Sequence, residues 1–259
     1  MDQPPPGIDP SNIPLAPNPN GDPPNFNSPE SLQTTVLATG IAFILVSGIC
    51  VVLRLYTGLK KSRKLFADDY FCVAGEIVGI AQWAVQYTMM THGLGRHSWD
   101  IPATALTLPV MKLQLASQML AAGTHFAVKA ALALFFIRVF GTLRWVRITC
   151  YSLLVLTLLS YASYEVIILI FCIPRSGEAW DHLIVARCTT GAPSTIAVGV
   201  CSVVADLVLF VMPFPIIAGL SLNPQKKRAL GIVFLIGFLV VVTSVVGLAY
   251  RVIVAVCRL

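Results

Sequence analysis

The chain has 259 residues, of which 56% are apolar and 12% charged, and its formal net charge at pH 7 is +6. Soluble domains carry about 25% charged residues, so this composition provides too little polar surface for a water-soluble fold. The basic residues fall in short runs between long apolar segments, which is typical of membrane proteins and not of nucleic-acid-binding surfaces. We therefore expect the lipid bilayer, and no nucleic acid, as a partner.

Residues 1–32 differ in composition from the rest of the chain. They are rich in Pro, Asn and Asp and contain no Lys or Arg. With so few large apolar groups, such a segment cannot offset the entropy lost on ordering. It also lacks the basic start and apolar run of a signal peptide. We predict a disordered Pro-rich tail at 1–32, followed by a transmembrane helical domain at 33–259 whose first span directs its own insertion.

Six apolar segments follow the tail. A bilayer core of about 30 Å requires roughly 20 apolar residues in a helix. The segments are residues 34–53, 70–90, 108–137, 148–173, 194–220 and 229–250. They are continuous apolar runs and not short alternating ones, which excludes a transmembrane strand barrel. The predicted fold class is an all-α, polytopic transmembrane bundle with six spans, with a kink near Pro213 and Pro215, which lack a backbone N–H.

The connections between these segments carry the basic residues unevenly. The first, third and fifth connections hold Arg54, Lys60, Lys61, Arg63 and Lys64, then Arg138, Arg144 and Arg147, then Lys226, Lys227 and Arg228. Because cytoplasmic loops are enriched in Lys and Arg, these three connections are expected in the cytoplasm and the N-terminus outside the cell. We expect a multi-pass protein of the plasma membrane, with its basic loops available to a cytoplasmic signalling partner.

Several ionisable and amide side chains lie within the apolar segments. Gln118, His125 and Lys129 share one helical face of the third segment, while the second, fourth and fifth contain Glu76, Glu165 and Asp206. A charged side chain inside a bilayer is costly and almost always faces the interior of the bundle. We predict a buried polar centre containing Lys129 and at least one of the three acids. Its role remains open between helix packing, ligand binding or switching, and ion or proton translocation.

Two cysteines are placed to form a disulfide. Cys172 ends the fourth segment and Cys188 lies in the following loop, which is expected on the oxidising side of the membrane. Closing a loop of about 15 residues would stabilise the fold by about 3 kcal/mol. The alternative is two free thiols. The other five cysteines lie in or beside apolar segments, where they are expected as small core residues.

The second connection combines glycine, charge and aromatic groups in a short stretch. It contains Gly93, Gly95, Arg96, His97 and Trp99. The two glycines favour a tight backbone, and the other three residues form a dense polar and aromatic cluster beside the membrane. The scattered histidines lack the spacing of a ligand set, so we expect no metal.

A series of landmarks runs along residues 34–259. It comprises Arg54, Asp68-Asp69-Tyr70, Gly93-Leu94-Gly95-Arg96-His97, Lys129, Phe136-Ile137-Arg138-Val139-Phe140, Cys172-Ile173-Pro174, Trp180, Cys188, Asp206, Pro213-Phe214-Pro215, Gly237 and Arg251. In order and spacing, the chain resembles the fungal rhodopsin-like integral membrane proteins, a seven-helix group that includes surface-sensing receptor candidates of plant-pathogenic fungi. That family has a seventh span with a cytoplasmic tail, and this chain ends before both. Seven-helix retinal proteins hold their chromophore on a lysine of the last span. Here that span is absent and Lys129 lies in the third segment, so we expect no retinal or other cofactor.

The resemblance implies a receptor-like membrane protein that senses an extracellular or membrane-dissolved small-molecule ligand. The alternative is a membrane enzyme or transporter that uses Glu76, Glu165 and Asp206 as acids within the bundle. Against an enzyme, the sequence contains no metal-ligand set, nucleophile-and-base pair or phosphate loop. Against a transporter, the first and last three segments show no inverted repeat. We therefore expect a receptor-like protein that is not an enzyme.

Overall fold

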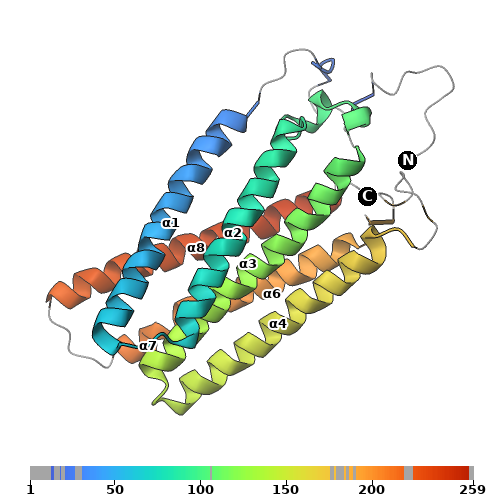
Figure 1. Ribbon diagram of the computed structural model, residues 1–259. Helices are drawn as coiled ribbons and strands as arrows, with labels where there is room; N and C mark the ends of the chain where they lie inside the picture. Colours follow the sequence, from blue (N-terminus) through green and yellow to red (C-terminus); the bar gives the residue numbers. More distant parts are fainter. Residues whose placement is uncertain are drawn as a thin grey trace. The chain divides into compact units, whose positions relative to one another are not determined.

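The computed structural model describes residues 13–14, 18, 21–26, 31–105, 107–175, 178, 184, 187–188, 191–218 and 224–256. Apart from an isolated bridge between Pro14 and Pro102, the regular structure of these residues is helical (Figure 1). The long helices are α1 (Gln33–Ser62), α2 (Ala67–Thr91), α3 (Leu108–Phe140), α4 (Arg144–Cys172), α6 (Ala192–Val211) and α8 (Pro224–Val256). A short helix, α7 (Pro213–Ala218), and two 3₁₀ turns, η2 (Ser98–Asp100) and η3 (Ala103–Ala105), complete the described elements. The all-α fold class is confirmed.

Five helical segments are long and apolar enough to cross a membrane. They are Gln33–Lys60, Leu108–Phe140, Arg144–Cys172, Pro193–Ile216 and Leu235–Ile253. The remaining predicted span, residues 70–90, lies in α2, a helix of 25 residues. The polar side chains of Glu76, Gln82 and Gln86 lower the mean hydropathy of α2 below that of the five segments named above. All six predicted segments are therefore helical, but composition alone marks only five of the described helices as spans.

The helices extend beyond the apolar segments that predicted them. α1 continues through Arg54 and Lys60, which the sequence analysis had placed in a loop, and ends at Ser62. Arg63 then adopts a left-handed conformation (φ 53°), and its N–H donates to the carbonyl of Leu59 at 3.0 Å. This arrangement satisfies one of the carbonyls left free at a helix end. Apolar composition thus marks the part of the helix in hydrocarbon and not its hydrogen-bonded length.

The fifth span is interrupted at the predicted position. α6 ends at Val211, the N–H of Met212 still donates to the carbonyl of Val208 at 3.0 Å, and α7 begins at Pro213. Pro213 and Pro215 cannot donate a backbone hydrogen bond, so a regular helix cannot continue through them. The helix is thus interrupted at the position where the sequence predicted a kink.

The chain forms two compact units. The first consists of Met1–Leu65 and Val73–Thr124, and the second of Phe66–Cys72 and His125–Leu259. In the first unit, α1 approaches α2 where Gly40 meets the indole of Trp83: a Cβ on Gly40 would lie 1.8 Å from the Trp83 Nε1. Such close approach of transmembrane helices requires a residue without a side chain.

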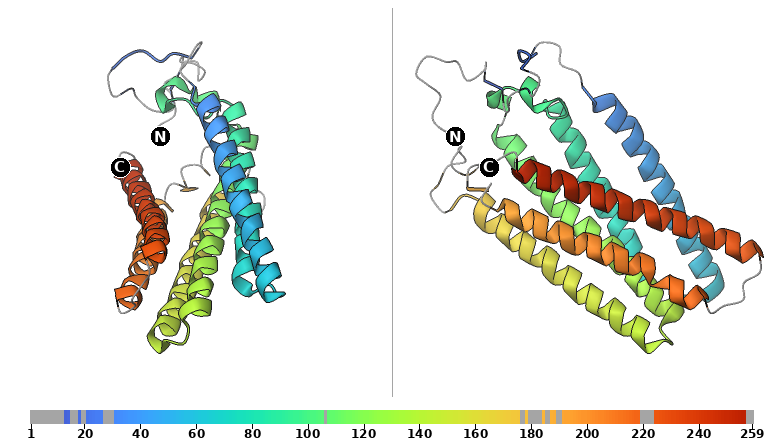
Figure 2. Two further views of the ribbon diagram at one scale, coloured as in Figure 1. Left: turned by 90° about the vertical axis from the view of Figure 1, so that its left-hand side faces the viewer. Right: turned by 180° about the vertical axis from the view of Figure 1, so that it is seen from behind.

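In the second unit, α6 contacts both α4 and α8 and lies between them (Figures 1 and 2). Its buried core is built from small and medium side chains of α3, α4 and the α6–α7 region, namely Ala133, Val146, Cys150, Leu153, Ala205, Leu209 and Met212. Small residues at these positions allow close helix packing without a hydrophobic driving force from water. This packing positions one face of α6 against α3 and α4.

Candidate functional site

A buried ion pair joins α3 to α6 in the second unit. The Nζ of Lys129 donates to the Oδ1 of Asp206, and each side chain is only 8% exposed. Lys129 also donates to the backbone carbonyl of Ser202 at 3.4 Å. The hydroxyl of Ser244 donates to the second carboxylate oxygen of Asp206 at 2.5 Å. Because Ser244 belongs to α8, this centre connects three helices.

The groups of this centre satisfy one another. Both carboxylate oxygens of Asp206 accept a hydrogen bond, and the ammonium of Lys129 has two acceptors. An isolated charge in so buried a position would be strongly unfavourable, whereas a paired charge with additional hydrogen bonds is tolerated. The arrangement therefore accounts for how two ionisable side chains remain inside an apolar bundle.

An aromatic pair lies beside the ion pair. The rings of His125 and Tyr161 are nearly parallel, with centroids 6.4 Å apart. The hydroxyl of Tyr161 donates to the side chain of Ser202 at 3.3 Å, and the carbonyl of the same serine accepts from Lys129. His125 on α3 is thus connected through Tyr161 of α4 and Ser202 of α6 to the charged centre.

The structure shows no contact of Glu165 with Lys129 or Asp206, and it assigns Glu76 and Gln118 to the first unit. Glu165 of α4 is half-buried, and its carboxylate makes no hydrogen bond or ion pair within the described part of the chain. Glu76 belongs to the first unit, where its Oε1 accepts from the hydroxyl of Ser47 of α1 at 3.0 Å. Gln118 also belongs to the first unit and is half-buried. Of the three candidate acids, Asp206 is the one the structure places beside Lys129.

Ser244 is a member of this centre that the sequence did not predict. A serine in a helix usually bonds to a carbonyl of its own preceding turn, and the adjacent Thr243 does so with Val240 at 2.9 Å. Only the packing of α8 against α6 shows that Ser244 instead reaches Asp206. The sole sequence signal was a hydroxyl within an otherwise apolar segment.

A second charged cluster joins two landmarks that the sequence analysis had treated separately. Arg138, near the end of α3, lies 3.3 Å from the Oδ2 of Asp68 and 3.7 Å from that of Asp69. Its guanidinium carbon also lies 3.6 Å from the ring centroid of Phe66, which is a cation–π geometry. The carboxylate of Asp69 accepts the backbone N–H of Phe66 at 3.1 Å at the start of α2. Acidic groups at a helix N-terminus are stabilised by the helix dipole.

The predicted disulfide between Cys172 and Cys188 is confirmed. Beside it, Arg187 donates to the carbonyls of Phe171 at 3.1 Å and Ile173 at 2.8 Å. These contacts satisfy carbonyls at the C-terminus of α4, where a cation is also favoured by the helix dipole. The disulfide and the arginine together tie the following loop to the end of α4.

Glu178 completes this arrangement. Its carboxylate accepts the backbone N–H of Arg175 at 2.9 Å and the guanidinium of Arg187 at 3.0 Å. The hydrogen bond from the Arg175 backbone, followed by that from Arg187, lowers the pKa of Glu178 below its ordinary value. Both hydrogen bonds therefore favour the ionised form of the Glu178 carboxylate.

The glycine-containing motif of the second connection forms a tight turn in the first unit. Gly93 and Gly95 have φ angles of 93° and 113°, which favour glycine. The rings of His97 and Trp99 stack with centroids 4.5 Å apart, while Arg96 is exposed. Of the predicted cluster, the structure shows the stacking of His97 and Trp99, and the role of the motif remains a prediction.

Described residues of the N-terminal segment contact this turn. The N–H of Asn25 donates to the buried carboxylate of Asp100 at 2.9 Å, and that of Leu32 donates to the carbonyl of Gly95 at 3.2 Å. Most of residues 1–32, for which disorder was predicted, lie outside the described residues, as does the landmark residue Trp180. Within the described part of the chain, no group of three or more His, Cys, Asp or Glu side chains is arranged to hold a metal ion.

Comparison with known proteins places these features in a family. Residues 53–255 match the family model described as the fungal rhodopsin domain. The chain belongs to this family. The fungal rhodopsin domain therefore includes α2 to α8 and with them the whole Lys129–Asp206–Ser244 centre. Together with its apolar helices, this membership makes the protein a multi-pass integral membrane protein.

The chain is also similar to a curated protein, a SAT4 family membrane protein of Emericella nidulans. The two chains are 25% identical over 178 residues, which represent 66% of this chain and 46% of the relative. The chain thus spans about half the length of that relative. No solved structure matches the chain.

Proposed function

We propose that this protein is a receptor-like sensor of a small-molecule ligand, either extracellular or dissolved in the membrane. In this proposal it resides in the plasma membrane with its N-terminus outside the cell. The observation that carries the proposal is the buried Lys129–Asp206 ion pair, which Ser244 extends to α8. The family membership and the basic connections on one side of the predicted spans support it.

The ion pair is suited to act as a two-state element. Buried ion pairs contribute little net stability compared with well-packed apolar side chains, and their best-attested use is to fix register or to switch it. A ligand that binds one arrangement of α3, α6 and α8 better than another would shift the balance between them. The interruption at Met212 would then transmit movement of α6 to the start of α8, where a cytoplasmic signalling partner can bind Lys226, Lys227 and Arg228.

The proposal assigns no catalytic step to the centre. Both oxygens of Asp206 already accept hydrogen bonds, and the lysine ammonium is held by the carboxylate and a carbonyl. A general base must instead be available to accept a proton from a substrate. The protein is therefore proposed to be a binding protein and not an enzyme.

The test uses purified protein in lipid nanodiscs and a panel of water-soluble metabolites, fatty acids and long-chain alcohols. A compound that binds the native state raises its thermal stability, by about 2.7 kcal/mol at one hundred times its Kd. Hydrogen–deuterium exchange of α3, α6 and the α6–α8 connection then reports the conformational response. We expect Lys129→Met/Asp206→Asn to bind or respond at least tenfold more weakly than wild type.

Glu165→Gln is the matched control, because it also neutralises a half-buried acid of a membrane helix but lies outside the ion pair. This variant should behave as wild type. If the doubly neutralised variant binds and responds normally, the pair serves packing and the switch role is wrong. The orientation is tested separately by the accessibility of an N-terminal tag to protease on intact cells; protection of the tag would overturn it.

A further inference from the structure

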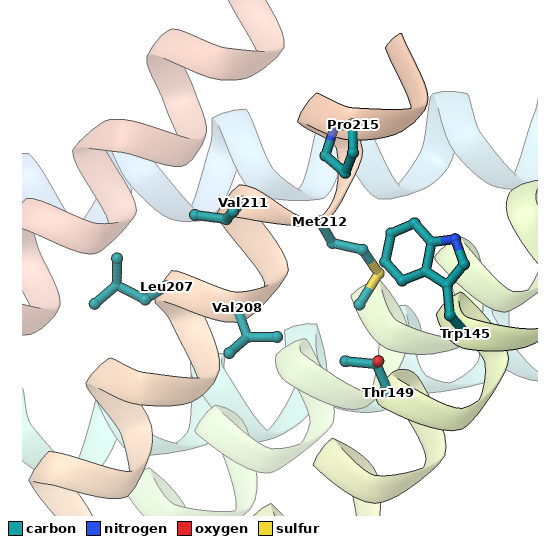
Figure 3. A pocket seen from close by; sticks show the side chains of 7 residues that line it. All are labelled: Trp145, Thr149, Leu207, Val208, Val211, Met212 and Pro215. Carbon is teal, nitrogen blue, oxygen red and sulfur yellow. The ribbon is translucent and has the colours of Figure 1, made fainter. Parts of the chain in front are cut away.

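An apolar recess of about 350 Å³ opens between α4 and the α6–α7 region of the second unit (Figure 3). Its principal lining side chains come from these three helices and from the α6–α7 junction: Trp145, Thr149, Leu207, Val211, Met212 and Pro215. Met212 is buried and contacts the thiol of Cys150 at 3.6 Å, so it closes the recess on the core side. The volume and apolar lining fall within the range of small-molecule sites.

The recess is elongated and open on one side. It follows α6 and α7 from Leu207 to Pro215, which corresponds to about 12 Å at 1.5 Å per residue. Its rim is exposed, with Trp145 and Leu207 each at 44% and Val211 at 52%. In a multi-pass membrane protein, such a surface faces hydrocarbon. An apolar recess of this length that is open on one side accommodates a segment of one lipid acyl chain.

Positive charge lies at one end of the recess. Arg144 begins α4 and immediately precedes Trp145; it is exposed, and its guanidinium makes no ion pair or hydrogen bond with any described residue. Arg147 is also exposed, and its guanidinium likewise has no such partner among the described residues. At 3.6 residues per turn, Arg144 lies about 100° from Trp145 around the helix, whereas Arg147 lies about 160° from it. Arg144 is therefore the cation nearer the mouth of the recess, where a long side chain extends toward the membrane surface.

We propose that this recess binds one anionic glycerophospholipid. One acyl chain occupies the recess between Trp145, Val211 and Pro215, and the phosphate and anionic headgroup interact with the guanidinium of Arg144. Arginine recognises phosphate through several N–H donors in a fixed plane. With the orientation proposed above, the site lies in the cytoplasmic leaflet, which carries the anionic lipids. The site does not depend on the Lys129–Asp206 centre or on the sensor function.

The experiment measures lipids retained by the full chain. The protein is reconstituted into nanodiscs of equal parts phosphatidylcholine and phosphatidylserine, released into mild detergent, and analysed by native mass spectrometry. We expect one phosphatidylserine to remain bound to wild type. Val211→Trp fills the recess and should lower the retained fraction at least tenfold. Val204→Trp is the control, because Val204 is similarly exposed on the same face of α6 but does not line the recess.

The arginine pair tests the headgroup contact with variants that do not alter the core. Arg144→Gln should reduce the preference for phosphatidylserine over phosphatidylcholine about fivefold, the usual effect of one basic residue near an anionic membrane surface. Arg147→Gln loses the same charge on the other side of α4 and should leave the preference unchanged. This comparison remains informative even if Val211→Trp fails to fold.

Three outcomes would overturn the proposal. Equal losses in Val211→Trp and Val204→Trp would show that the retained lipid is a general surface layer. Equal effects of the two arginine variants would show a diffuse charge effect and no site. A dimer that carries no lipid and dissociates in Val211→Trp would show that a second copy of the chain covers the recess.

Discussion

Neutralising one member of the buried ion pair should destabilise the protein more than neutralising both. In Lys129→Met, Asp206 would keep its charge in a position only 8% exposed, with Ser244 as its remaining side-chain donor. Breaking a buried pair by removing one partner costs about 3–5 kcal/mol, because the other charge is left uncompensated. Asp206→Asn should have a comparable effect, since it leaves the ammonium of Lys129 without its carboxylate.

The double variant Lys129→Met/Asp206→Asn removes both charges while retaining similar side-chain volumes. Its loss of stability should be smaller than that of either single variant, so the coupling energy, which is the sum of the two single losses minus the double loss, should exceed about 3 kcal/mol. Ser244→Ala removes a hydrogen bond to a charged group, which is worth about 1.5–3 kcal/mol. Thr243→Ala is its control, because Thr243 bonds only within its own helix and should cost less than about 0.5 kcal/mol.

The assay is the free energy of unfolding of each variant in bicelles, measured by steric trapping with identical labelling sites. Disulfide formation and circular dichroism would verify that each variant retains its native helices. Two results would refute the reasoning. Single variants within about 0.5 kcal/mol of wild type would mean that the charges are not buried together. A double variant as unstable as the worse single one would mean that side-chain shape, and not charge pairing, determines the cost.

Three further predictions concern other parts of the molecule. Cys172→Ser should lower the free energy of unfolding by about 3 kcal/mol, and dithiothreitol should lower the wild-type Tm but not that of the variant. Gly40→Ala should cost about 1–3 kcal/mol because its Cβ would meet Trp83, whereas Gly247→Ala, which has open space, should leave the Tm nearly unchanged. The pKa of Glu178 is lowered, so its stabilisation is complete above the ordinary glutamate pKa of about 4.3 and is lost as the pH falls through the lowered value. Limited proteolysis of the loop should show this loss below pH 4, and Glu178→Gln should remove it; an unchanged pH profile would contradict the assignment.

The sequence predicted the helices well because hydrocarbon imposes a simple requirement. A segment that crosses the bilayer must be apolar and must satisfy its own backbone hydrogen bonds, and both properties can be read locally. The interruption at Met212 was predictable for the same reason, because Pro213 lacks a donor whatever surrounds it. Helix ends were less predictable: α1 continues through Arg54 to Ser62 because backbone hydrogen bonding does not stop where hydrophobicity does.

The candidate site was predictable only in part. Lys129 within an apolar segment indicated a partner, but the sequence left Glu76, Glu165 and Asp206 equally available. Their assignment depends on which helices pack together, and no local pattern specifies that. The contact of Arg138 with Asp68 illustrates the same point, since the two residues belong to motifs that are far apart in the chain.

The sequence by itself determined that this protein crosses a membrane as helices, and it predicted a paired Lys129 and a disulfide between Cys172 and Cys188. These properties follow from the cost of placing polar groups in hydrocarbon and from the position of each residue along one helix. Only the tertiary structure decided that Asp206 and Ser244 meet Lys129, that Arg187 caps α4, and that an apolar recess opens beside Trp145. These features arise from side chains on different helices, and their energies exist only once the helices are packed.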